Sequence, residues 1–182
     1  MNKLFTLTTA SILSLFLASC ASNLTVPNQP SSAALSVSDD ERAIAERVYA
    51  LVNGQRVTNG KRTMRGHYGL NVLAQKHSLY MGSTLSMANH FGSENRAQYA
   101  YLKYGIENLS EMTYVVYGGS SDPAADAVGA WKASPDHVKH MLQSWDLTGV
   151  GVEKAPTGDV YITICMGAQP LGAPRSIRPI GW

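Results

Sequence analysis

The chain has 182 residues, of which 45% are hydrophobic, and a formal net charge of +2. This length supports one globular domain with a substantial core and leaves little room for a second. The charge is close to neutral, and no block of basic residues is interleaved with aromatic ones, which excludes an electrostatic platform for nucleic acid.

The N-terminus has the features of an export signal. Lys3 is followed by an apolar or hydroxylated run over residues 4–17, which is too short to span a bilayer. The run ends in Leu17-Ala18-Ser19-Cys20, which resembles the lipobox of bacterial lipoprotein precursors. That resemblance implies cleavage before Cys20 and acylation of this cysteine, so that lipid chains anchor the protein in the membrane. The alternative is an ordinary secretory signal in which Cys20 is incidental.

Composition divides the rest of the chain. Residues 1–19 are predicted to be the signal peptide, and residues 20–37, rich in Ser, Ala, Asn and Pro, a flexible tether. Residues 38–168 form the predicted globular domain, and residues 169–182 an irregular C-terminal tail that contains Pro and Arg. The protein is therefore expected in the cell envelope, outside the cytoplasm, and on the outer membrane if the host has one.

Capping residues and helical periodicity predict helices through the first two thirds of the domain. Ser38-Asp39-Asp40-Glu41 is a capping box that starts the first helix, and Asp122-Pro123 starts the last of this group. The predicted helices run from Ser38 to about Asn53-Gly54 or one turn later, from Asn71 to Leu85, from Ser93 to Tyr104, and from Asp122 past Trp131.

A further helix start carries a histidine. In Ser134-Pro135-Asp136-His137, Ser134 can cap the helix and Pro135 suits its first position, which places His137 in the first turn. The positive end of the helix dipole disfavours a charged imidazole there. A neutral imidazole at a fixed position is a suitable metal ligand or general base. The alternative is a capped helix whose histidine is incidental.

Strand signals gather near the C-terminal end of the domain. An extended segment at residues 106–109 leads into the β-forming run at residues 114–117. Residues 149–154 and 159–166 read as an antiparallel hairpin, whose second strand holds Cys165 as a buried small hydrophobe rather than a reactive thiol. Antiparallel strands with helices packed on them indicate the α+β class.

Several motifs, in order, resemble the CAP superfamily of cysteine-rich secretory, antigen 5 and pathogenesis-related proteins, and in particular its bacterial SCP-like members. The similarity extends from about residue 46 to residue 167. The motifs are Val52-Asn53-Gly54-Gln55-Arg56, Leu73 to Met81, Asn89-His90-Phe91, Glu107-Asn108-Leu109, Trp131 with Ser134-Pro135-Asp136-His137, and Gly149-Val150-Gly151-Val152.

The resemblance implies a single domain with an α-β-α sandwich, an antiparallel central sheet and a large cleft. It implies that His90 and His137 line the cleft and bind zinc or another divalent metal, with no organic cofactor. Glu107 would be the acidic neighbour and tentative catalytic residue. Asn108 and Ser134 would lie in the cleft, Ser134 in place of a second glutamate. Two imidazoles with bound water suit zinc, although one more protein ligand is usual in catalytic sites.

The other histidines have simpler interpretations. His77 falls on the apolar face of the second predicted helix, which favours a hydrogen-bonded, partly buried side chain over a metal ligand. His140 could share the helix face of His137, but a solvated surface position is favoured. Nothing in the sequence selects His67, which is predicted to lie in a loop.

Two main functional hypotheses follow. The first is a lipid-anchored binding or interaction module of the cell envelope, with a cell-wall fragment, a lipid or a protein as its ligand. The second is a metal-dependent hydrolase, a peptidase or nuclease-like enzyme, that uses water bound to a metal at His90 and His137 with Glu107 as the base. A third is that the cleft is vestigial and the domain structural. Because one fold hosts many functions, the resemblance does not choose among them.

Overall fold

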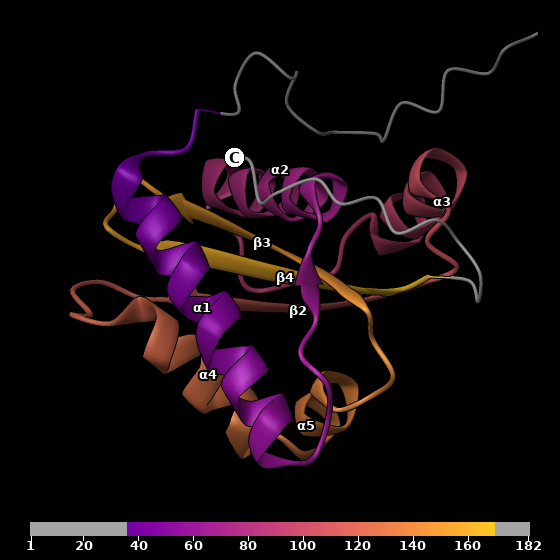
Figure 1. The fold of residues 1–182 in the computed structure, drawn as a ribbon. Coiled ribbons are helices and arrows are strands. Elements are labelled where there is room, and N and C mark those ends of the chain that lie inside the picture. The colour runs from indigo at the N-terminus through magenta and orange to yellow at the C-terminus, as the bar shows by residue number, and fades with distance from the viewer. Residues whose placement is uncertain (1–35, 170–182) are drawn as a thin grey trace, which may run out of the picture.

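The computed structural model describes residues 36–169 (Figure 1). Within this range the elements are α1 (Asp39–Thr58), β1 (Arg65–Gly66), α2 (Tyr68–Thr84), α3 (Ser93–Tyr104), β2 (Asn108–Val116), α4 (Pro123–Ala133), α5 (Pro135–Met141), β3 (Leu147–Lys154) and β4 (Val160–Ala168). The predicted signal peptide, Cys20, most of the tether and the tail beyond residue 169 lie outside the described residues.

The strands form one sheet in the order β1-β3-β4-β2. α2 and α3 cover one face, and α1, α4 and α5 lie on the other, so the predicted α-β-α sandwich and the α+β class are confirmed (Figure 1). β4 pairs antiparallel with both β2 and β3, as the hairpin predicted, but β1 pairs parallel with β3. The sheet is therefore mixed, because the two-residue β1 was too short to give a sequence signal.

Most helix starts follow their predicted caps. Ser38 and Glu41 form the reciprocal capping box, and Asp122 and Ser134 accept amide hydrogens of the first turns of α4 and α5. α2 begins at Tyr68, three residues before the prediction, because the His67 side chain accepts the amide hydrogen of Leu70. α3 begins at Ser93, but its cap is Gly92 rather than Ser93. α1 extends to Thr58.

Two glycines of β3 let α2 lie directly on the sheet. A Cβ atom at Gly149 would lie 2.1 Å from the carbonyl carbon of Leu70, and one at Gly151 would lie 2.2 Å from the amide nitrogen of Gln75. At this distance the Gln75 side chain bonds both backbone groups of Val152, with contacts of 2.7 and 2.9 Å. The glycine-rich strand is thus explained by a close approach of helix and sheet backbones.

The opposite face of the sheet holds the larger core. Val150 and Val152 alternate with the glycines and pack with α1 and with Trp131 of α4, which is fully buried. The indole of Trp131 donates a hydrogen bond to the backbone oxygen of Thr113 in β2. These contacts fix α4, and therefore α5 behind it, against the β2 edge of the sheet.

Arg56 fixes the far end of α5. The residue is 2% exposed, and its guanidinium donates to the backbone oxygens of Met141, Gln143 and Trp145 at 2.6, 2.9 and 3.3 Å. Asn53, one turn earlier in α1, bonds both backbone groups of Met64. The Asn-Arg pair in the first helix therefore has a structural role, because it holds the loops before β1 and after α5.

Candidate functional site

A buried ion pair stands at the centre of the site. Glu111 lies in β2, opposite Cys165 of β4, and its side chain is 5% exposed. Arg96 of α3 is 1% exposed and donates from Nε to Oε2 and from Nη2 to Oε1 of Glu111, both at 2.7 Å. This bidentate arrangement fixes the carboxylate plane, because the planar guanidinium matches both oxygens at once.

His90 also forms a hydrogen bond with the Glu111 carboxylate. It lies in the loop between α2 and α3, and its Nδ1 is 3.0 Å from Oε1 of Glu111. Since an ionised carboxylate only accepts hydrogen bonds, Nδ1 carries the proton of this bond, which leaves Nε2 as the ring nitrogen that is not bonded to Glu111. The His90 side chain is 51% exposed, so a buried pair orients a solvent-accessible imidazole.

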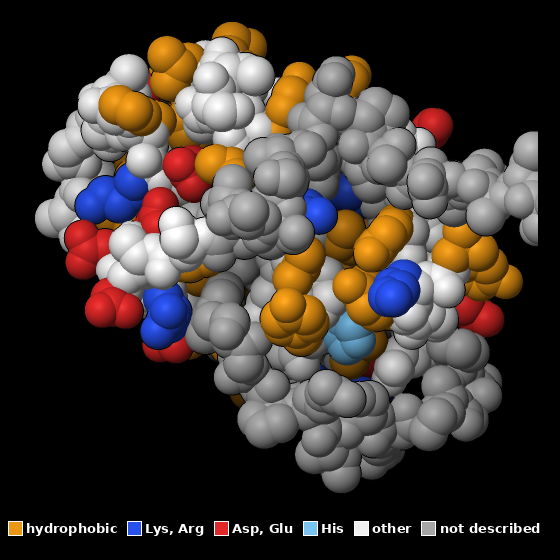
Figure 2. All heavy atoms as spheres, turned by 90° about the horizontal axis from the view of Figure 1, so that it is seen from above, with side chains coloured by type: hydrophobic (Ala, Val, Ile, Leu, Met, Phe, Trp, Pro, Cys, Tyr) orange, Lys and Arg blue, Asp and Glu red, His pale blue; other side chains and the backbone are white. Residues whose placement is uncertain are grey.

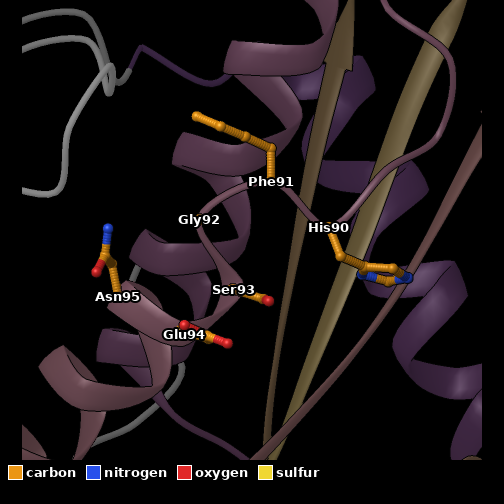
Figure 3. Close-up of a pocket in the computed structure, with 6 residues that line it drawn as sticks. All are labelled: His90, Phe91, Gly92, Ser93, Glu94 and Asn95. Atoms are coloured by element: carbon orange, nitrogen blue, oxygen red, sulfur yellow. The ribbon is translucent and has the colours of Figure 1, made fainter.

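The loop around His90 also shapes a shallow hollow. The hollow has a volume of about 370 Å³, and its lining runs from His90 through Gly92 to Asn95. Figure 3 shows the His90 ring and the Phe91 side chain pointing to different sides of this loop. Arg96 holds the loop by donating from Nη1 to the backbone oxygen of Phe91 at 2.8 Å.

The surroundings keep Glu111 ionised. Burial alone would raise the pKa of its carboxyl group, but the hydrogen bonds from His90 and Arg96 and the positive charge of Arg96 outweigh this and lower the pKa. His77 of α2 lies beside the pair, with its Nε2 3.6 Å from Oε1 of Glu111. Burial lowers the pKa of His77, so this ring is neutral.

His77 supports the loop that carries His90. It is fully buried, and its Nε2 donates to the backbone oxygen of Asn89 at 2.8 Å, next to His90. The predicted role of a buried, hydrogen-bonded histidine is confirmed on this side of the ring. Nδ1 has no hydrogen-bond partner among the described residues.

His137 lies in the first turn of α5, as predicted, with its backbone amide capped by Ser134 at 3.5 Å. Burial lowers the pKa of its ring first, and the charges of His140 and His90 lower it further. The ring is therefore neutral, through burial and neighbouring histidines. The hollow beside His90 is lined by residues 90–95 and does not include His137.

His140 adds a third imidazole at this edge. It is exposed, as predicted, but its Nδ1 is also 3.3 Å from the hydroxyl of Ser110 in β2. Ser110 and Glu111 are adjacent residues of the edge strand, and adjacent strand residues point to opposite faces. The β2 edge therefore has Glu111 with His90 on one face and Ser110 with His140 on the other.

The acidic neighbour of His90 is Glu111 and not Glu107. Glu107 precedes β2 with an exposed side chain, and its backbone amide pairs with Ala168. Asn108 is likewise exposed at the first position of β2. The catalytic role suggested for Glu107 stays a prediction, but the described residues give it no bond to a histidine. The sequence signal for Glu111 was an acidic residue inside a run of β-forming residues. A carboxylate that is buried in a strand requires a hydrogen-bonding or oppositely charged partner.

Within residues 36–169 there is no group of three or more His, Cys, Asp and Glu side chains arranged to hold a metal ion. The same residues include no helix long and apolar enough to cross a membrane. Cys165 is fully buried, and burial raises the pKa of its thiol well above the usual value, as expected for a structural cysteine.

Solved structures share the fold. An outer surface protein from Borrelia burgdorferi has a TM-score of 0.56 and 16% identity, over 74% of this chain and 97% of that one. An extracellular protein with an SCP domain from Bacillus anthracis has a TM-score of 0.59 and 18% identity, over 74% and 45%. A cysteine-rich secretory protein from Staphylococcus aureus has a TM-score of 0.54 and 16% identity, over 73% and 40%.

The chain thus spans less than half of the last two proteins. No curated protein matches the sequence significantly. The sequence model described as "CAP: Cysteine-rich secretory protein family" matches residues 49–166, which is most of the described domain, so this chain belongs to the CAP family.

Proposed function

We propose that this protein is a lipid-anchored binding module of the bacterial cell envelope, whose ligand-binding cleft presents His90 and His137 beside the β2 edge. The observation that carries the proposal is the Arg96–Glu111–His90 chain of hydrogen bonds. Its two buried members are 1% and 5% exposed, whereas the His90 side chain is 51% exposed. A buried ion pair costs desolvation free energy, and here it fixes the ring of an accessible histidine.

The geometry supports capture of an electron-pair acceptor, such as a divalent metal or a hydrogen-bond donor of the ligand. A carboxylate that bonds Nδ1 fixes the tautomer and increases the basicity of Nε2, as in carboxylate–histidine–metal arrangements. His137 contributes a second imidazole, whose pKa is lowered by burial, and its buried Nδ1 has no hydrogen-bond partner in the described structure.

A divalent metal such as zinc would be held by His90 and His137, with Glu111 orienting His90 from behind. The metal would supply Lewis acidity to whatever oxygen or nitrogen ligand completes its coordination. Since two imidazoles are one ligand short of the usual catalytic set, we expect modest affinity. No organic cofactor enters the proposal.

The contacts favour binding over hydrolysis. Both oxygens of Glu111 are occupied by Arg96, and its lowered pKa makes it a weak base. Glu107, the base of the hydrolase hypothesis, has an exposed side chain outside the Arg96–Glu111–His90 chain.

The cellular location rests on two observations. The first is the lipobox-like Leu17-Ala18-Ser19-Cys20, which lies outside the described residues. The second is that structural relatives include proteins named as outer surface or extracellular. If Cys20 is the anchor, Cys20→Ala will block processing and labelling by a radioactive fatty acid. Unchanged labelling would exclude Cys20 as the anchor.

The cleft is tested by calorimetric zinc titration of residues 21–182, which retain every described residue. We expect one site that His90→Ala and His137→Ala each weaken at least about tenfold, because each removes one of two ligands. His67→Asn, which keeps a capping side chain on α2, should bind zinc like the wild type. If neither substitution in the cleft changes binding, the two histidines do not form a site.

A further inference from the structure

A second cavity lies at the opposite edge of the sheet, beside β1. It has a volume of about 510 Å³, and its walls come from β1, the start of α2, the end of α3 and the start of β3. This volume is within the range of small-molecule sites. Its lining residues include Arg65, His67, Tyr68, Lys103, Tyr104 and Leu147.

The cavity is lined by cations without anions. Arg65 and Lys103 are both exposed, and no acidic residue lines the cavity. The only side-chain partner of Arg65 among the described residues is the neutral Oε1 of Gln169, at 3.1 Å. All 13 acidic residues of the chain lie within the described range, and none of them forms an ion pair with Arg65 or Lys103. Among the described residues these two cations therefore have no acidic partner, and both are exposed to an external anion.

The remaining lining is aromatic and apolar. The rings of His67 and Tyr104 meet edge to face, with centroids 5.3 Å apart, and Leu147 is buried below them. A Cβ atom at Gly69 would lie 2.4 Å from the Tyr104 ring, so the glycine provides the space in which this ring lies. Tyr68 is 58% exposed at the rim. Figure 2, which looks down on the face that carries α2 and α3, shows hydrophobic and basic side chains gathered beside a histidine.

The titratable His67 and Tyr104 side chains of the cavity are uncharged, so its charge comes from Arg65 and Lys103. Burial lowers the pKa of His67, and the neighbouring Arg65 lowers it further, so the ring is neutral near pH 7. Burial also raises the pKa of Tyr104 to about 12, which keeps its phenol protonated. The cavity thus combines a net positive rim with faces suited to a planar apolar group.

From this arrangement we propose that the β1 cavity is a binding site for a small anion with an aromatic body, such as an aromatic carboxylate. Arg65 and Lys103 bind the anionic group, and His67, Tyr68 and Tyr104 contact the ring. The site is separate from the histidine cleft, because β1 and β2 are opposite edges of the sheet.

The test uses 2-naphthoate as the probe and the uncharged 2-naphthamide as its control, added to ¹⁵N-labelled residues 21–182 and followed by amide chemical shifts. We expect saturable shifts at the starts of β1 and α2 and the end of α3, with a dissociation constant of about 1 mM or below for a ligand of this size. The amide should bind at least about tenfold more weakly, because it lacks the charge that Arg65 and Lys103 recognise.

Charge-removing variants test whether Arg65 and Lys103 bind the carboxylate of the probe. Lys103→Gln and Arg65→Gln should each weaken 2-naphthoate binding about five- to tenfold, because each removes one partner of the carboxylate. Lys61→Gln changes the net charge equally on the same edge. Lys61 lines the adjoining hollow, which shares Arg65 with this cavity, but it does not line the cavity itself, so its loss should change binding less than about twofold. Tyr68→Ala should weaken the acid and the amide alike, because both share the aromatic body.

Three results would overturn the proposal. They are the absence of saturable shifts up to about 5 mM probe, equal binding of the acid and the amide, and an equal loss in Lys61→Gln and Lys103→Gln. The last two would mean that the probe responds to general charge or general hydrophobicity rather than to this cavity.

Discussion

The two edges of the sheet use charge in opposite ways. At the β2 edge, Arg96 and Glu111 are buried and bonded to each other, and the accessible group is the imidazole of His90. At the β1 edge, Arg65 and Lys103 are exposed and have no acidic partner within residues 36–169. A buried ion pair costs desolvation free energy but fixes the orientation of the groups bonded to it. Exposed charges without partners remain able to attract an external ligand of opposite charge. The β2 edge therefore presents an oriented side chain, whereas the β1 edge presents a positively charged cavity.

The carboxyl groups of Glu111 and Glu153 differ in the same way, because only Glu111 has oppositely charged or hydrogen-bonding partners among the described residues. Glu111 has Arg96 and His90 as partners, and its pKa is lowered in spite of burial. Glu153 of β3 packs against α2, where a Cβ atom at Gly82 would lie 2.7 Å from its Cγ. Burial, with a smaller effect of the charge on Glu41, raises the pKa of Glu153 to about 7. The difference lies in the partners, because burial raises the pKa of an unpaired carboxyl group.

The largest effect is expected from breaking the buried pair. Arg96→Met leaves Glu111 buried with the acceptor sites of Arg96 unfilled, which should lower the free energy of unfolding by about 3–5 kcal/mol. Guanidinium denaturation at pH 7 measures the loss. The double variant Arg96→Met/Glu111→Leu should recover at least half of it, because no uncompensated charge remains. A loss below about 1 kcal/mol in the single variant would show that the pair does not organise this edge.

An intermediate effect is expected from Glu153. Its folded-state pKa is raised from 4.5 to about 7, so the folded state binds more protons between these values and the free energy of unfolding falls as pH rises through them. Glu153→Gln should remove that slope and be about 1–2 kcal/mol more stable than the wild type at pH 8, with allowance for partial exposure.

Urea denaturation from pH 4 to pH 8 measures this difference, with Glu46→Gln, an exposed position of α1, as the matched control. The control should follow the wild-type pH dependence. A Glu153→Gln variant with the wild-type slope would show that another group carries it.

The smallest effect on stability is expected at the β1 edge. Arg65→Gln removes an exposed cation whose side-chain bond is to a neutral amide, so the free energy of unfolding should change by less than about 0.5 kcal/mol. The same denaturation assay measures it beside Arg96→Met. A loss above about 1 kcal/mol would mean that this edge, like the other, uses its charge for folding.

Local signals in the sequence predicted much of the fold. The capping box at Ser38, the Asp122-Pro123 and Ser134-Pro135 helix starts, and the hairpin after residue 148 all depend on interactions within a few residues, and each is confirmed. The positions of His90 before α3 and His137 in the first turn of α5 followed from the same signals. Local chemistry also determined the α+β class, because it fixed the order of helices and strands.

Tertiary structure decided which residues meet. Glu111 rather than Glu107 contacts His90 because the register of β2 on β4 turns Glu111 toward α3, where Arg96 neutralises it. The parallel β1 strand exists through its pairing with β3, and the β1 cavity through the meeting of segments about 40 residues apart, as between Arg65 and Lys103. Such contacts depend on strand register and on helix packing, which no short stretch of sequence encodes, because the free energy that fixes them comes from partners distant along the chain.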